Sequence, residues 1–150
     1  MNTRMQKIKN DLEFKILILE AQQEAALDGI LIVNTKREVV SFNKQFVDMW
    51  DIPPDIIETR DDKQFIQSVL DKLRHPEKFT EKIEKLMMDL KQISDDELQL
   101  KDGRCFARYS KSIHDIDETV RGRVWFFRDI TELKRAQHEL KCHRKKLEKS

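Results

Sequence analysis

The sequence predicts an α+β protein built on one antiparallel sheet. Apolar residues recur at helical spacing near both ends and in the middle of the chain, and they alternate in two separate groups of short segments. The first group has two β-like segments, and the second, after the central helices, has three. Strands that are grouped in this way, rather than alternating with single helices, favour an antiparallel sheet.

Residues 1–27 are expected to form a helix, because their apolar side chains fall on a helical stripe among charged ones. Asp28-Gly29 follows and suits the end of a helix. The stripe consists of Met5, Ile8, Leu12, Ile16, Leu19 and Ala26.

Two short strands are expected next, at residues 30–33 and 39–42, with a hairpin turn at 34–37 between them. Asn43 stands where the second strand ends, and its side chain can cap a following helix. A short amphipathic helix comes next, and Pro53-Pro54 closes it. Its apolar residues are Phe46, Val47, Met49 and Trp50.

Two longer helices are expected in the middle of the chain. His75-Pro76 separates them, and proline suits the first position of the second helix. Residues 94–96, which follow, are expected to form a loop. The two apolar faces consist of Phe65, Ile66, Val69, Leu70 and Leu73 in the first helix, and of Phe79, Ile83, Leu86, Met87 and Leu90 in the second.

From residue 97 onward the apolar residues alternate, as they do in strands. Asp102-Gly103 is the strongest hairpin signal in the chain, and it follows the alternating residues 97–100. A long strand at 105–113 and a last strand at 120–128, joined by a polar connection, complete the sheet. By strand parity, Trp125, Phe127 and Asp129 share one face, and Val124, Phe126 and Arg128 share the other.

The last strand runs almost directly into a charged C-terminal helix. Asp129 or Thr131 can cap that helix, and Glu132 suits the positive potential of its first turn. The apolar residues that follow are spaced as in a heptad, which predicts a weak coiled-coil seam. The seam consists of Leu133, Ala136, Leu140, His143 and Leu147.

The composition indicates one domain with helical extensions in a reduced, cytoplasmic setting. Charged residues make up 38% of the 150 residues, against about 25% in average proteins, and hydrophobic residues make up 39%. Cys105 and Cys142 form no CxxC pair. No apolar run approaches the roughly 20 residues that span a membrane, and the N-terminus lacks the apolar core of a signal peptide.

The formal net charge of +1 gives no general affinity for nucleic acid, and no nucleic-acid partner is expected. Residues 131–150 are locally basic, with seven Lys or Arg against three Glu. A basic helix of this kind can touch phosphate or a membrane surface. A solvated flank of a coiled coil fits the heptad better, so no membrane contact is expected of this segment.

Four pieces of the chain, in order, resemble the PAS domain family. The opening hairpin of the family is similar to AALDGILIVNTKREVVSFN, with Asp28-Gly29 before the first strand and Asn43 after the second. Its short helix and proline break are similar to FVDMWDIPPDII, and its central hairpin to ELQLKDGRCFARYSKSI, with Asp102-Gly103 at the tip. Its closing strand and Asp-Ile-Thr junction resemble GRVWFFRDITELKRAQ. The resemblance covers residues 21–139.

This resemblance implies a PAS domain at residues 28–130, between flanking helices at 1–27 and 131–150. The implied fold is a five-stranded antiparallel sheet with helices over one face that enclose a pocket. The Trp125/Phe127 face would look into the pocket, and the other face would pack under the N-terminal helix. The candidate pocket residues are Phe46, Trp50, Ile57, Phe65, Val69, Phe79 and Met87 from the helical region, Arg108 or Tyr109 for a polar contact, and Trp125 and Phe127. The alternative is that these large side chains simply fill a core.

The implied function is that of a sensor domain in a bacterial signalling protein, such as a sensor histidine kinase or a diguanylate cyclase. Asp129, Ile130 and Thr131 would relay the state of the pocket to the C-terminal helix. A homodimer and an output domain in a longer parent chain are the expected partners. The rival is a ligand-free dimerisation or spacer module. The residues expected to pair in the dimer are Leu133, Ala136, Leu140 and Leu147.

The sequence shows no motif for catalysis, for a metal site or for a common PAS cofactor, and an enzyme is not expected. Cys105 lies on a predicted strand and has no flavin-adduct motif around it. His75 precedes a proline at a helix break, which suits an exposed loop better than a haem ligand. The chain has three glycines, too few for a phosphate loop. Asp61-Asp62 and Asp95-Asp96 are interpreted as loop and cap residues. The resemblance still allows a small-molecule ligand, and the sequence does not identify it.

Overall fold

The computed structural model describes residues 3–25, 28–89 and 91–149, apart from some side chains of the two terminal helices. The described strands form a five-stranded sheet in the order β2-β1-β5-β4-β3, and every neighbouring pair is antiparallel. The predicted α+β fold with an antiparallel sheet is therefore confirmed. The strands are β1 Gly29–Asn34, β2 Val39–Phe42, β3 Ser94–Gln99, β4 Cys105–His114 and β5 Val120–Asp129.

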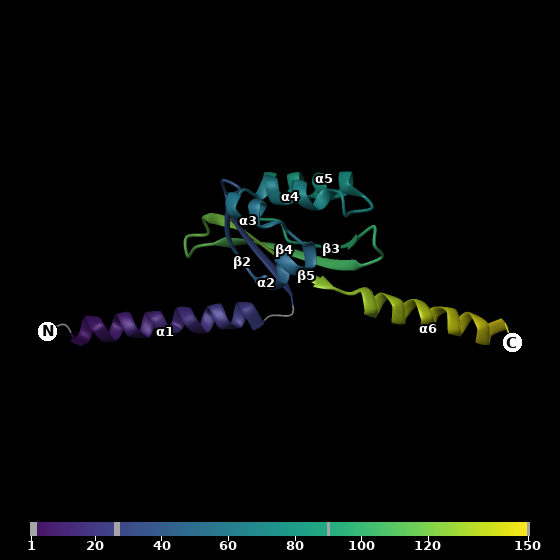
Figure 1. Cartoon of the computed structure of the whole chain (residues 1–150), viewed down its shortest axis with the longest axis horizontal. Coiled ribbons are helices and arrows are strands. Elements are labelled where there is room, and N and C mark those ends of the chain that lie inside the picture. The colour runs from purple at the N-terminus through teal and green to yellow at the C-terminus, as the bar shows by residue number, and fades with distance from the viewer. Residues whose placement is uncertain (1–2, 26–27, 90, 150) are drawn as a thin grey trace.

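The helices between β2 and β3 pack on one face of the sheet. Figure 1 shows α4 and α5 lying over that face, and α2 and α3 add apolar side chains to the same core. The core thus lies between a helical layer and the sheet, as the sequence predicts. The helices are α2 Lys44–Trp50, α3 Pro54–Thr59, α4 Asp62–Leu70 and α5 Pro76–Met88.

The two faces of β5 separate as strand parity predicts. Trp125 and Phe127 are each 4% exposed and belong to the core beneath the helices. Phe126 lies on the opposite face, where its ring centroid is 6.0 Å from that of Tyr109 on β4. Val124 is on this outer face as well and pairs across the ladder with Ile32 of β1. One strand therefore contributes side chains to the core and to the outer surface of the sheet.

The predicted turn signals are confirmed at both hairpins. Asn34 Oδ1 accepts hydrogen bonds from the backbone N–H groups of Lys36 and Glu38, at 3.0 and 2.9 Å, which closes the β1–β2 turn. Arg37 in this turn has a φ of 65°. Gly103, in the β3–β4 turn, has a φ of 95°, a conformation that glycine adopts without steric cost.

Asn43 fixes the point at which β2 passes into α2. Its Oδ1 accepts from the N–H groups of Ile30 and Phe46, at 2.9 and 3.0 Å, and its Nδ2 donates to the carbonyl of Asp28 at 2.9 Å. The side chain is 1% exposed, so its removal leaves buried backbone groups without partners. We expect Asn43→Ala to lower the free energy of unfolding by about 2 kcal/mol. Urea unfolding followed by tryptophan fluorescence measures this loss.

The control for Asn43 is Asp61→Ala. Asp61 caps α4 by accepting from Lys63 N–H at 3.1 Å, and it is more exposed than Asn43. Its loss is expected to cost about 1 kcal/mol, the usual value for a cap. Equal losses in the two variants would contradict a special role for Asn43.

Two elements differ from the prediction. Residues 94–96 begin β3 and are not a loop, because Ser94 is buried and Asp96 forms an ion pair with Arg108 across the β3–β4 ladder. Those cross-strand partners outweigh the poor strand propensity of aspartate. Pro54 does not simply end a helix but occupies the first turn of α3, a position that needs no N–H donor.

The terminal helices, α1 Thr3–Ala25 and α6 Thr131–Lys149, extend away from the domain in opposite directions (Figure 1). The expectation that the N-terminal helix covers the outer face of the sheet is wrong for the described part of α1. Met5, Ile8 and Leu12 are 55–74% exposed. Phe14 and Leu17 lie off this stripe and are exposed too, so no single apolar face is available for burial. The predicted stripe residues Ile16, Leu19 and Ala26 lie outside the described side chains.

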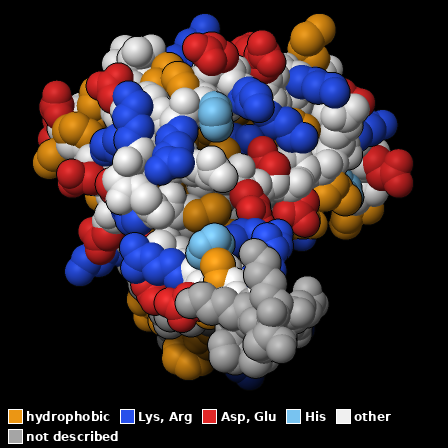
Figure 2. Space-filling model, turned by 90° about the vertical axis from the view of Figure 1, so that its right-hand side faces the viewer, with side chains coloured by type: hydrophobic (Ala, Val, Ile, Leu, Met, Phe, Trp, Pro, Cys, Tyr) orange, Lys and Arg blue, Asp and Glu red, His pale blue; other side chains and the backbone are white. Residues whose placement is uncertain are grey.

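The predicted seam on α6 faces solvent in the single chain. Leu133 and Leu140 are 54% and 50% exposed, and Ala136 is exposed as well. The side chains of His143 and Leu147 lie outside the described part of the chain. Figure 2 shows the end of the molecule from which α6 extends, where basic and acidic side chains are interspersed. Among the described helices, none is both long and apolar enough to cross a membrane.

Candidate functional site

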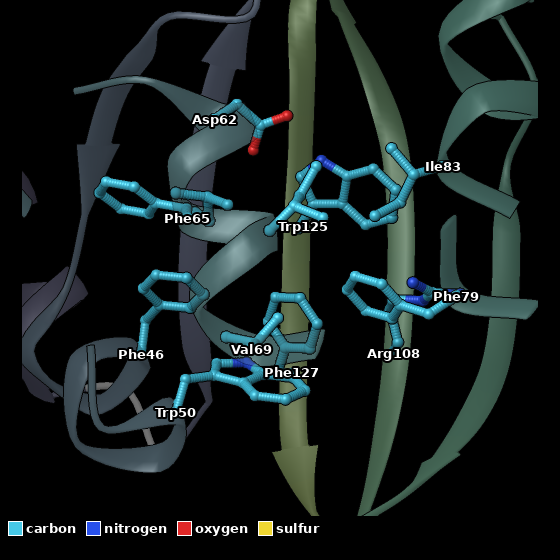
Figure 3. A pocket seen from close by; sticks show the side chains of 12 residues that line it. Phe46, Trp50, Asp62, Phe65, Val69, Phe79, Ile83, Arg108, Trp125 and Phe127 are labelled. Atoms are coloured by element: carbon cyan, nitrogen blue, oxygen red, sulfur yellow. The ribbon is translucent and has the colours of Figure 1, made fainter. Parts of the chain in front are cut away.

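A small cavity lies in the core between the sheet and the helical layer (Figure 3). Its volume is about 30 Å³, which is room for roughly one or two water molecules. Side chains from both layers form its walls, and nearly all of them are apolar. The lining residues are Leu31 on β1, Phe46 and Trp50 on α2, Asp62, Phe65, Ile66 and Val69 on α4, Phe79 and Ile83 on α5, Arg108 on β4, and Trp125 and Phe127 on β5.

Trp50 connects the helical layer to the sheet at this cavity. Its ring centroid lies 5.0 Å from that of Phe106 and 5.5 Å from that of Phe127, both in edge-to-face geometry. The side chain is 1% exposed, and its indole Nε1 has no hydrogen-bond partner among the described residues. A buried tryptophan N–H normally finds an acceptor. The cavity wall therefore carries one unused donor.

Arg108 brings a buried positive charge to the same cavity. It is 1% exposed, and its Nε and Nη2 donate to the two carboxylate oxygens of Asp96, at 2.9 and 2.6 Å. Its guanidinium carbon lies 4.8 Å from the ring centroid of Phe79 and 5.5 Å from that of Trp125. The third nitrogen, Nη1, is buried and has no hydrogen-bond partner in the part of the chain that the structure describes. The wall thus holds a second unused donor, and this one belongs to a cation.

Asp62 places a carboxyl group at the α4 side of the cavity. It is 4% exposed, and its Oδ2 lies 3.5 Å from Arg37 Nε. That contact is an ion pair without hydrogen-bond geometry, because Arg37 Nε has no hydrogen-bond partner. Burial, only partly offset by Arg37, raises the pKa of Asp62 to about 6. Arg37 is shared with Glu84 on α5, to which its Nη1 donates at 2.9 Å.

Most of the predicted pocket residues do line this cavity. Those that do so are Phe46, Trp50, Phe65, Val69, Phe79, Arg108, Trp125 and Phe127. Ile57 and Met87 pack against the core as partly buried residues and do not reach the cavity. Tyr109 is wrong as a pocket residue: Arg108 faces inward, so its neighbour on the strand must face outward, and Tyr109 is 39% exposed on the outer face.

Four lining residues are not among the predicted ones. Ile66 and Ile83 lie on the apolar faces of their helices, and Leu31 alternates with outward residues on β1, so the sequence carried a signal for each. Asp62 is different. The interpretation of Asp61-Asp62 as cap residues holds for Asp61, but Asp62 lies in the cavity wall, and no sequence pattern indicates that.

The junction between β5 and α6 is held by one compact set of hydrogen bonds. Asp129 Oδ1 accepts from both the N–H and the hydroxyl of Thr131. Thr131 Oγ1 accepts in turn from Cys105 N–H on β4 at 3.0 Å, and Ile130 N–H donates to the Cys105 carbonyl at 2.9 Å. The first turn of α6 is also tied to β3, because Lys134 Nζ lies 2.8 Å from Glu97 Oε1. The start of α6 is therefore connected directly to β5, β4 and β3.

A second connection joins the N-terminal side of the domain to the same strand. Arg128 donates from Nε and Nη2 to the two carboxylate oxygens of Asp28, at 2.8 and 3.2 Å. The Asp28 carbonyl also accepts from Asn43, whose Oδ1 caps α2. Asp28, the first described residue after α1, is thus linked to Arg128 near the end of β5 and, through Asn43, to helix α2 of the cavity wall.

The sheet order, the helices on one face and the small core cavity between them together define a PAS-type fold. A family model described as the PAS fold matches residues 24–138. The chain therefore belongs to the PAS fold family, as its sequence predicts. No curated protein sequence matches the chain.

Solved structures with the same fold come from several signalling proteins. The PAS domain of an HTR-like protein from Haloarcula marismortui has a TM-score of 0.58 at 14% identity, over 83% of this chain and 99% of that one. The PAS domain of Bordetella pertussis BvgS has a TM-score of 0.57 at 17% identity, over 85% and 96%. A sensory box histidine kinase/response regulator from Burkholderia thailandensis has a TM-score of 0.53 at 14% identity, over 88% and 98%. At these identities the likeness establishes the fold.

Proposed function

We propose that this chain is the sensor domain of a bacterial signal-transduction protein, and that it reports the state of its core cavity through α6. The observation that carries the proposal is the pair of unused donors, Trp50 Nε1 and Arg108 Nη1, in a cavity wall that is apolar apart from these two residues and Asp62. A buried donor without an acceptor is costly. A small molecule with an apolar body and an acceptor group satisfies both the donors and the apolar wall.

The route from the cavity to α6 runs along β5. Trp125 and Phe127 form part of the cavity wall, and Asp129 lies on the same face two residues further along. A ligand that prefers one arrangement of these aromatic rings shifts the balance between two positions of the strand end, in proportion to its difference in affinity. Because Asp129 accepts from Thr131 N–H, and Thr131 Oγ1 accepts from Cys105 N–H, that shift moves the first turn of α6.

The exposed seam of Leu133, Ala136 and Leu140 supports a parallel homodimer in which paired α6 helices carry the signal to an output domain in a longer chain. In this proposal the domain works in the cytoplasm, and it acts as a sensor like the sensory box histidine kinase whose domain shares its fold. The kinase or cyclase chemistry then belongs to the output domain and not to the PAS domain.

The cavity volume of about 30 Å³ supports a second candidate function, a ligand-free dimerisation or spacer module. Native mass spectrometry of the freshly purified protein separates the two functions. A co-purified small molecule supports the sensor, and a bare protein whose Trp50→Phe variant signals normally supports the spacer.

The junction provides a direct test of the relay. Asp129→Ala removes the acceptor of Thr131 and is expected to cost about 1 kcal/mol, the value of a helix cap, so the domain stays folded. We expect amide exchange in the first turn of α6 to accelerate by about fivefold, and the regulation of a C-terminal output domain to be lost. Hydrogen exchange and an output assay measure the two effects.

The control for the junction is Asp115→Ala. Asp115 likewise accepts from backbone N–H groups, those of Asp117 and Thr119, but it lies in the β4–β5 hairpin away from α6. Normal regulation in the Asp129 variant, or equal loss in both variants, would refute the relay through the junction.

A further inference from the structure

A second hollow lies outside the core cavity, between the start of α5 and the free edge of β3. Its volume is about 320 Å³, roughly ten times that of the cavity. Two residues, Phe79 and Arg108, line both spaces. They therefore form the wall that separates the buried cavity from the open hollow. The other residues that matter here are Leu73, His75, Lys78 and Asp96.

An ion pair between Arg108 and Asp96 holds the β4 side of this wall. Arg108 is 1% exposed, whereas the side chain of Asp96 is 30% exposed on the hollow side. Asp96 occupies Nε and Nη2 of Arg108 and leaves Nη1 without a partner. The planar guanidinium lies within 5.5 Å of the ring centroids of both Phe79 and Trp125. A ligand group that displaces Asp96 from Arg108 would free both the guanidinium of Arg108 and the Phe79 ring that packs against it.

The helix that carries Phe79 begins without a side-chain cap. His75 occupies the N-cap position of α5 and makes no side-chain capping hydrogen bond. Pro76 follows and has no N–H of its own. The first turn of α5 is held by the packing of Phe79, by the hydrogen bond from Phe79 N–H to the His75 carbonyl at 3.3 Å, and by that from Arg74 N–H to the Gln99 carbonyl at 3.0 Å just before it. A displacement of this turn joins the hollow to the cavity.

The charges around the wall favour a negative ligand. Arg108 has an unused donor, and Lys78 and His75 line the same hollow. The carboxylate of Asp96 is already engaged with Arg108. Glu97 also lines the hollow, and its carboxylate is in an ion pair with Lys134. An incoming carboxylate or similar anion thus meets the unused Nη1 donor of Arg108 and the side chains of Lys78 and His75, and the two acids of the hollow are already paired.

We propose that Arg108 and Phe79 form a gate through which a small anionic molecule with an apolar body enters the cavity, and that Asp96 is the latch. The anion replaces Asp96 on Arg108, or takes the free Nη1, while the apolar body occupies the space next to Phe79 and Trp125. The proposal rests on the proposed sensor function and names its ligand class and its route of access.

The two tryptophans of the chain make the gate measurable without knowledge of the ligand. Trp50 and Trp125 are the only tryptophans, and both line the cavity. Their fluorescence is quenched only by molecules that come into contact with them. Iodide serves as an anionic probe, caesium as a cationic probe and acrylamide as a neutral probe, each titrated at constant ionic strength.

The variant that tests the latch is Asp96→Asn, and its matched control is Asp95→Asn. Both changes remove one negative charge from β3, but Asp95 is exposed on the strand and Asp96 holds Arg108. We expect Asp96→Asn to raise the iodide quenching constant by at least about twofold and to leave caesium quenching unchanged, because a freed cation attracts anions. Asp95→Asn is expected to match the wild type. Phe79→Ala is expected to raise quenching by acrylamide as well.

Equal iodide quenching in Asp96→Asn and Asp95→Asn would overturn the gate, as would a parallel rise for iodide and caesium. A Phe79→Ala protein that is folded by circular dichroism but not more accessible to acrylamide would also overturn it. These outcomes leave the sensor function standing if a small molecule co-purifies with the protein, since the ligand would then use another route.

Discussion

Replacing Asp62 by asparagine is expected to raise the free energy of unfolding by about 3 kcal/mol at pH 7.5. The carboxyl is 4% exposed in an apolar wall, and its pKa is raised from 3.8 to about 6. The charged form is thus less stable in the folded protein than in the unfolded chain. Asparagine has nearly the same shape and carries no charge, so it removes that net cost, which the raised pKa gives after the attraction of Arg37 is included.

The pH dependence of this effect has a definite sign. Because the folded-state pKa lies above the unfolded value, the folded protein binds more protons between pH 4 and pH 6. Stability from this group is fully present below the unfolded pKa and is lost as the pH rises through about 6. The difference in stability between Asp62→Asn and wild type should therefore be small near pH 4 and should grow toward its full value above pH 7. Urea unfolding at several pH values measures it.

Asp61→Asn is the matched control for Asp62. Asparagine caps helices about as well as aspartate, and Asp61 has no place in the cavity wall. We expect this variant to follow the wild-type pH curve. A stability of Asp62→Asn that falls with pH as steeply as that of the wild type would show that Asp62 does not titrate in this range.

The sequence predicts most of the residues in the cavity wall, but it does not predict Asp62. The apolar periods of α4 and α5 predict Phe65, Val69 and Phe79 in the wall, because the side chain that faces the sheet is set by the helical repeat. In the same pattern, a polar residue at the start of a helix, such as Asp62, is interpreted as a capping residue. Only the tertiary arrangement, which brings Arg37 from the β1–β2 turn to Asp62, distinguishes a capping acid from a buried one.

The sheet offers a similar contrast. Strand parity fixes the faces of Trp125 and Phe127 from the sequence alone. It could not decide between Arg108 and Tyr109, because either parity fits a strand with mixed residues on both faces. The ladder settles this, since Arg108 pairs with Phe127 and Asp96, and Tyr109 with Phe126. Arg108 can be recognised as a buried arginine once its partner Asp96 is known. The sequence, however, assigns Asp96 to a loop.

The two terminal helices are predicted correctly as helices, but the burial of α1 is not. Their existence follows from helical periods, and both are present. The predicted burial of α1 against the outer sheet face is not, because its apolar residues are spread around the helix. Whether such a surface is buried depends on the molecules next to it. The stripe on α1 and the seam on α6 therefore concern the proposed dimer and not the fold of the domain.

Gly122 is the position at which we expect the largest loss of stability from a single added methyl group. A Cβ at this residue would lie 2.1 Å from the carbonyl oxygen of Val33 and 3.1 Å from the Cα of Asn34. Both atoms belong to the backbone of β1, which β2 and β5 hold in register, so neither can move alone. Gly122→Ala is expected to lower the free energy of unfolding by about 3 kcal/mol or more, at the upper end of the cost of overpacking.

Gly103→Ala is the comparison that isolates close approach from backbone conformation. Gly103 has a φ of 95°, and a Cβ there would meet no atom within 4 Å, so its cost is that of a left-handed conformation, about 1 kcal/mol. Urea unfolding of both variants, followed by the fluorescence of the two tryptophans, measures the difference. A loss in Gly122→Ala no larger than in Gly103→Ala would mean that β1 can move away from β5. Such freedom would weaken the proposed relay, because the relay requires β5 to be held firmly enough to pass a shift at Trp125 on to Asp129.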